Sequence, residues 1–170
     1  YLRLSRDVYP DLYPAGTQFE MGKGAIVREG TDVTVIACGL LVHKAIEAAE
    51  ELEKSGVSVR VVDMYSIKPI DAELIVRCAK ETGAIVVAEE HNIYGGLGSA
   101  VSEVLAHEGA AAPTEFVGVQ DQFGQVGPQD FLMDEYGLRA ANIVAACQII
   151  TEKYNGEVPA DMDALTSLPG

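Results

Sequence analysis

The 170-residue chain has a length typical of one domain, and its 48% apolar content is that of a folded protein rather than a disordered one. Twelve lysines and arginines against 26 acidic residues give a net charge of −14, which disfavours nucleic acid and anionic membranes as partners. The chain has no run of 18 apolar residues, and residues 1–6 have no signal-peptide pattern. We therefore expect a soluble domain.

The three cysteines lie far apart, each in an apolar stretch: Cys38, Cys78 and Cys147. An odd, widely spaced set predicts neither a disulfide framework nor a paired metal or redox site. Buried free thiols are typical of a reducing compartment, so we expect a cytoplasmic location.

The first third of the chain opens with an irregular segment and then has two short β-branched runs. Glycines and prolines are frequent in residues 1–24, which predicts a linker-like lead-in after a short strand at 1–4. The β-branched runs at 25–29 and 33–38 are separated by three turn residues, Gly30-Thr31-Asp32. This spacing predicts an antiparallel hairpin, and the second run is apolar enough for a central strand covered on both faces.

Strand and helix patterns alternate through the rest of the chain. Apolar spacing predicts helices at 42–54, after the N-cap Asp71, after Gly98, near 130–136 and at 140–154, and strands at 57–64, 84–88 and 116–119. This alternation favours a three-layer, doubly wound α/β fold on a mostly parallel five-stranded sheet with one antiparallel strand. We expect residues 25–154 to form this domain and residues 155–170 to form a tail.

Functional sites in such folds form at the carboxyl ends of the strands. Glu89-Glu90-His91 follows a buried run, and two functional interpretations are open: an acid/base group, or an interface contact made by Glu90 and His91. A loop histidine bonded to a neighbour is the more common case. The glycine-rich turn at 95–99 precedes a helix and could hold an anion, but the GxGxxG spacing is absent and a tight turn explains the glycines equally well.

Other chemistry finds little support in the residue pattern. His43 and His107 have no second ligand three or four positions away, which predicts no metal site. Ser66, Ser99 and Ser102 lack the GxSxG pattern of a hydrolase nucleophile.

Two arginines near the beginning of the chain are suited to binding a phosphate. Arg6 alternates with Leu2 and Leu4 on one face of the predicted strand, and Arg3 lies on the other. A guanidinium binds phosphate through two parallel hydrogen bonds. Residue type alone favours solvent-exposed arginines at a strand end.

Seven segments, in order, resemble landmarks of the transketolase family: residues 1–6, 19–24, 29–34, 63–71, 89–100, 118–124 and 136–138. The first resembles the end of the pyrimidine-binding domain, so residues 1–24 would be the end of that domain and a linker. The next two resemble entry into the C-terminal domain. The last two fit transketolase better than its relatives.

This resemblance implies a homodimeric enzyme of the pentose phosphate pathway that uses thiamine diphosphate and Mg²⁺ to transfer a two-carbon ketol unit between sugar phosphates. The cofactor would lie between pyrophosphate- and pyrimidine-binding domains, whose Gly-Asp-Gly motif is absent from this chain. The chain would then have a structural, dimer-supporting role, bind no cofactor and be inactive alone. Arg6 matches a family arginine that binds the substrate phosphate, and Arg3 is the weaker candidate.

Related thiamine enzymes share the first and middle landmarks. Deoxyxylulose-phosphate synthases and the β subunits of 2-oxoacid dehydrogenases therefore stay open as alternatives. A dehydrogenase-type domain would dock a partner protein, and its signature would be an exposed apolar patch near the loops after Ala88 and Val119. A stand-alone nucleotide-binding domain is a third alternative, disfavoured by the missing glycine fingerprint.

Overall fold

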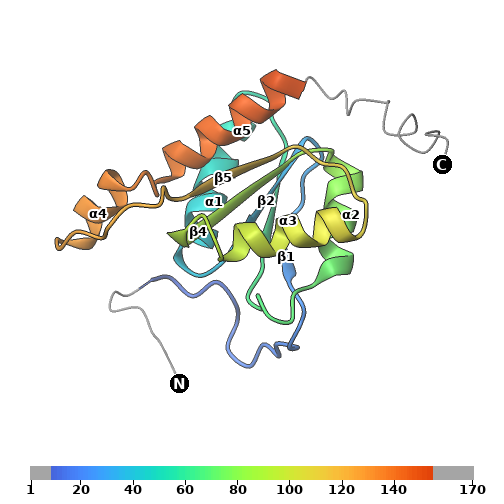
Figure 1. Ribbon diagram of the computed structural model, residues 1–170, viewed down its shortest axis with the longest axis horizontal. Coiled ribbons are helices and arrows are strands. Elements are labelled where there is room, and N and C mark those ends of the chain that lie inside the picture. The colour runs from blue at the N-terminus through green and yellow to red at the C-terminus, as the bar shows by residue number, and fades with distance from the viewer. Residues whose placement is uncertain (1–8, 155–170) are drawn as a thin grey trace, which may run out of the picture.

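The computed structural model describes residues 9–154 (Figure 1). Arg3, Arg6, the predicted strand at 1–4 and the predicted tail at 155–170 lie outside the described residues. Within the described part of the chain, no helix combines the length and apolar character needed to cross a membrane.

Strands and helices alternate along the chain in the order β1 (Ala25–Arg28), β2 (Val33–Ala37), α1 (Leu40–Glu53), β3 (Val59–Asp63), α2 (Ala72–Thr82), β4 (Ile85–Asn92), α3 (Leu97–His107), β5 (Thr114–Val119), α4 (Gln129–Glu135) and α5 (Ala140–Tyr154). The five strands form one sheet in the order β1-β3-β2-β4-β5, in which only β1 is antiparallel to its neighbour. The predicted fold class is confirmed.

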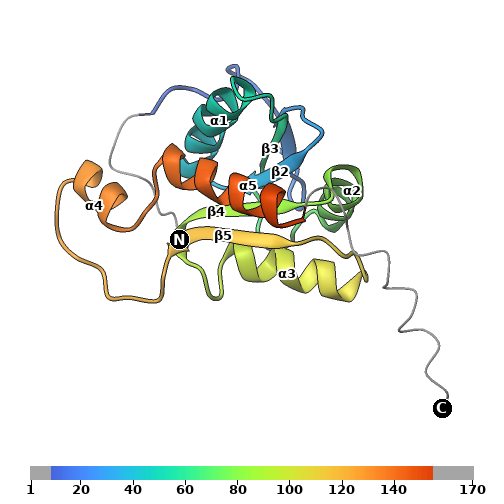
Figure 2. The same ribbon diagram turned by 90° about the horizontal axis from the view of Figure 1, so that it is seen from above.

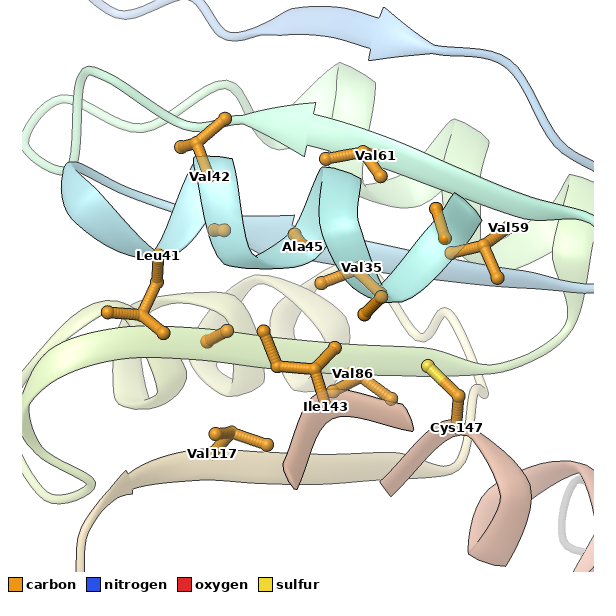
Figure 3. Packing of buried hydrophobic residues seen from close by; sticks show 14 of the residues in the cluster. Val35, Leu41, Val42, Ala45, Val59, Val61, Val86, Val117, Ile143 and Cys147 are labelled. Carbon is orange, nitrogen blue, oxygen red and sulfur yellow. The ribbon is translucent and has the colours of Figure 1, made fainter. Parts of the chain in front are cut away.

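Two apolar cores, one on each face of the sheet, give the molecule three layers. Helices α1 and α5 cover one face and α2 and α3 cover the other (Figure 2). In the first core, Val35 and Val86 of the sheet pack with Ala45 of α1 and with Ile143 and Cys147 of α5 (Figure 3). β2 and β3 are buried along their whole length. Their valine, isoleucine and alanine residues face both cores, and the buried polar residues Thr34, Arg60 and Asp63 interrupt the two apolar runs.

The predicted hairpin of the first two strands is wrong. β1 pairs with β3, and β3 lies between β1 and β2. The connecting turn crosses the start of β3, where the Thr31 and Asp32 N–H groups donate to the Ser58 carbonyl at 3.2 and 2.9 Å. At Gly30 a Cβ would overlap the backbone of Arg60, so glycine is needed for this crossing. The three-residue turn would allow a hairpin, but β3 lies beside β2 in the place that β1 would take in a hairpin. β3 therefore pairs with β1 on one side and with β2 on the other.

The predicted N-cap of α2 is confirmed, whereas the C-cap of α1 is Lys54, two residues before the predicted cap Gly56. The Asp71 carboxylate accepts a hydrogen bond from the Leu74 N–H at 3.1 Å at the start of α2. Gly56 follows α1 with a φ of 85°, a left-handed conformation that favours glycine, and its N–H donates to the Glu53 carbonyl.

Candidate functional site

Acidic side chains gather at the carboxyl edge of the sheet, where the parallel strands end. Asp63 is the last residue of β3 and Glu89 lies in β4, and both are buried. Cys38 follows β2 beside them, and burial, Glu89 and Asp63 together raise the pKa of its thiol to about 12. The thiol therefore stays protonated near neutral pH, which excludes it as a nucleophile under those conditions.

The Glu89 side chain stabilises the first turn of α3. It is only 3% exposed and accepts hydrogen bonds from the Leu97 and Gly98 N–H groups at 2.7 and 2.8 Å. A Cβ at Gly96 would overlap the Glu89 carboxylate, so the glycine-rich turn makes room for it. An internal carboxylate thus occupies the helix N-terminus, where an external anion would otherwise bind.

This geometry decides between the two explanations of residues 95–99. The N–H groups of Leu97 and Gly98 bond to Glu89, and the Gly95 N–H donates to the Ser99 hydroxyl at 2.7 Å. A phosphate placed there would also face the charge of the Glu89 carboxylate. The tight-turn interpretation is supported, and the anion cradle is not.

Glu90 and His91 lie within β4, which runs to Asn92 rather than ending at Ala88 as expected. Both side chains are exposed. His91 Nδ1 lies 2.6 Å from the Asn92 carbonyl oxygen and 3.8 Å from the Glu89 carboxylate. His91 therefore makes local contacts, and the role of Glu90 and His91 at an interface stays a prediction.

The lead-in segment covers this edge of the sheet. The Tyr13 hydroxyl donates to Asp63 Oδ2 at 2.8 Å, and the Tyr9 ring stacks on His43 with 6.2 Å between centroids. Burial raises the pKa of both Asp63 and Tyr13, and the bond to the Asp63 carboxylate raises that of Tyr13 further. Sequence reasoning missed these contacts; the only signal is the repeated aromatic residues of a segment otherwise rich in proline and glycine.

Beyond this edge, the loop after β5 and the helix α4 project from the body of the domain (Figures 1 and 2). We call residues 120–139 the projecting arm. Phe123, Val126 and Phe131 on this arm have exposed side chains. Exposed apolar side chains are therefore present beyond Val119, at one of the two loops where an apolar patch was expected.

Comparison with known proteins identifies the family. Residues 22–143 match the family described as transketolase, C-terminal domain. The chain belongs to this family. A split gene transketolase solved as an inactive β4 tetramer matches the fold of this transketolase C-terminal domain with a TM-score of 0.80 at 50% identity, covering 84% of this chain and 46% of that one.

Two curated relatives show how the chain is placed in longer proteins. A 6-deoxy-6-sulfo-D-fructose transketolase subunit of Clostridium sp. (strain MSTE9) is 42% identical over 155 residues, which are 91% of this chain and 48% of the relative. A 1-deoxy-D-xylulose-5-phosphate synthase of Heliobacterium modesticaldum is 40% identical over 136 residues, 80% of this chain and 21% of the synthase. The transketolase C-terminal domain thus spans about half of the first relative and about a fifth of the second.

The described residues do not fit the thiamine diphosphate and Mg²⁺ that the family implies. A bound pyrophosphate needs free N–H groups or cations, but the N–H groups of Leu97 and Gly98 are bonded to Glu89. The charged groups around Cys38 at the carboxyl edge are Glu89, Asp63 and Glu90, which raise the pKa of its thiol and would repel a pyrophosphate. Among the described residues, no three His, Cys, Asp or Glu side chains form a group able to hold a metal ion.

Proposed function

We propose that this chain is the C-terminal domain of a transketolase that uses thiamine diphosphate and Mg²⁺ to transfer two-carbon ketol units between sugar phosphates. It serves as a structural domain that supports a cytoplasmic homodimer, while separate pyrophosphate- and pyrimidine-binding domains hold the cofactor. The family match over residues 22–143 carries this proposal. The internal carboxylate at the start of α3 supports a structural rather than cofactor-binding role.

A second candidate is the C-terminal domain of a 1-deoxy-D-xylulose-5-phosphate synthase. The 40% identity to such a synthase favours it, although the match to the transketolase subunit covers more of this chain. Both candidates predict the same fold and the same absence of a cofactor site here, so only the reaction of the complete enzyme separates them.

Reconstitution tests the proposal and separates the two candidates. The chain is combined with a polypeptide from the same organism that carries the two cofactor-binding domains, together with thiamine diphosphate and Mg²⁺. We expect ketol transfer from a ketose phosphate to an aldose phosphate, followed by mass spectrometry, and no reaction when either polypeptide is omitted. Formation of 1-deoxy-D-xylulose 5-phosphate from the same mixture, without ketol transfer, would select the second candidate.

The role of Arg6 is tested in the complete enzyme. Loss of a charged hydrogen bond to the substrate phosphate raises KM for phosphorylated sugars about 10–100-fold in Arg6→Ala and leaves KM for unphosphorylated sugars unchanged. Arg77→Ala, which removes an exposed arginine of α2, is the matched control and changes neither value. Equal KM values for Arg6→Ala and the unmodified enzyme would remove the assignment.

A further inference from the structure

The tip of the projecting arm, residues 122–129, presents two large apolar side chains to solvent, Phe123 and Val126. Phe123 is 98% exposed and Val126 is 101% exposed, the highest values among the exposed large apolar residues of the described chain. Both lie in the loop between β5 and α4, and this loop stands away from the sheet in both overall views (Figures 1 and 2). Exposed apolar side chains gathered at one place are typical of a protein–protein contact.

Hydrogen bonds within the arm order its loop against its helix. The Gln125 N–H donates to the Tyr136 hydroxyl at 2.6 Å, and its side-chain amide donates to Glu135 at 2.8 Å. Arg139 donates to Asp134 at 2.7 and 3.0 Å, and the same guanidinium reaches Asp130. Because these bonds already order the arm, a partner that binds its tip spends less free energy on ordering it.

The Phe131 ring stiffens the base of the tip. A Cβ added at Gly127 would lie 2.7 Å from this ring, so the ring packs directly against the backbone of the loop. The loop therefore contacts α4 at Gly127, and Phe123 and Val126 project from a turn that α4 supports.

Charge indicates what kind of partner fits the tip. Residues 122–129 contain no charged side chain, but the arm around them carries Asp121, Asp130, Asp134 and Glu135. The arm's only basic residue, Arg139, is engaged with two of these carboxylates. An apolar tip within an acidic rim is complementary to an apolar hollow bordered by lysines and arginines. A second copy of this chain would bring the same acidic rim, and its net charge is also −14.

The position of the arm indicates which polypeptide carries that hollow. Gln129 on the arm donates a hydrogen bond to the Tyr9 hydroxyl of the lead-in. The lead-in follows residues 1–6, which resemble the end of the pyrimidine-binding domain. The arm thus lies beside the segment that adjoins the cofactor-binding part in the transketolase family.

We propose that the projecting arm docks into an apolar, basic-rimmed hollow on the polypeptide that carries the cofactor-binding domains, with Phe123 and Val126 as the buried anchors. This inference rests on the proposed function, because it requires that polypeptide as the partner. The arm then holds the two parts of the enzyme in a fixed orientation.

The test compares a double variant, Phe123→Ser with Val126→Ser, with the control Ile149→Ser, which makes the same kind of change at an exposed apolar residue of α5. Titration calorimetry measures binding of each chain to the polypeptide with the two cofactor-binding domains, at low and high salt. We expect the double variant to bind about 30-fold or more weakly and the control to bind as the unmodified chain does. Binding of the unmodified chain should also weaken as salt rises, because the rim charges are screened. Circular dichroism should show the same melting for all three chains.

The outcomes separate this inference from the proposed function. If the double variant binds and reconstitutes activity like the unmodified chain, the docking role is overturned and the proposed function stands. If no chain binds the cofactor-binding polypeptide, both are overturned. If sedimentation shows that the unmodified chain forms dimers that the double variant does not form, the tip pairs with a second copy and the inference is wrong.

Discussion

Removal of the Glu89 carboxylate tests how the start of α3 is held. Glu89→Ala leaves the buried Leu97 and Gly98 N–H groups without their acceptor. A hydrogen bond to a charged group contributes about 1.5–3 kcal/mol, so two lost bonds, partly offset by water entering the space, lower the free energy of unfolding by about 3–5 kcal/mol. For a domain of this length the melting temperature should fall by roughly 10 °C.

Glu89→Gln separates the two bonds from the size of the side chain. The amide keeps one acceptor oxygen but places an NH₂ donor against the second N–H group, so the expected loss is about 2 kcal/mol. Glu103→Gln on the exposed face of α3 is the control and should stay within about 0.5 kcal/mol of the unmodified chain. The assay is urea unfolding followed by circular dichroism. If both Glu89 variants unfold with the same free energy as the control, the Glu89 side chain does not stabilise the helix.

Two further predictions concern groups at the carboxyl edge whose pKa values are raised. Burial raises the pKa of Asp63, so the folded chain binds this proton more tightly than the unfolded chain, and the stability from this group is lost as pH rises above about 4 through the folded pKa. Asp63→Asn should therefore gain unfolding free energy relative to the unmodified chain at pH 7 but not at pH 4; an equal loss at both pH values in urea unfolding would refute this. Cys38, with its pKa near 12, should react with iodoacetamide at pH 7.5 at least about 100-fold more slowly than free cysteine, as measured by mass spectrometry of its peptide; a rate close to that of free cysteine would show that its thiolate is accessible.

The alternation of strands and helices was predictable because each element has its own apolar period. Asp71 as an N-cap and the left-handed Gly56 after α1 were predictable for another reason: such features depend on residues only a few positions away. Strand order was not predictable in full. Gly30 permits a turn, but only the buried position of β3 determines that the turn crosses that strand instead of closing a hairpin.

The contacts of the candidate site were harder to predict because they join residues that are distant along the chain. Tyr13 and Asp63 are 50 residues apart, and nothing in either segment specifies the other. Glu89 was visible as an acidic residue after a buried run, but the sequence analysis concentrated on Glu90 and His91 and did not predict that Glu89 accepts two hydrogen bonds from the start of α3. Gly96 carries the relevant signal, because a glycine just before a helix leaves room for a side chain that bonds to the first N–H groups. Arg3 and Arg6 lie outside the described residues, so their phosphate role stays a prediction.

Cofactor binding by the isolated chain tests the central claim most directly, namely that the chemistry lies in other domains. Titration calorimetry with thiamine diphosphate and Mg²⁺ should give no saturable heat with this chain alone, and saturable binding once the polypeptide with the cofactor-binding domains is present. Saturable, micromolar binding of thiamine diphosphate to the isolated chain would contradict the claim.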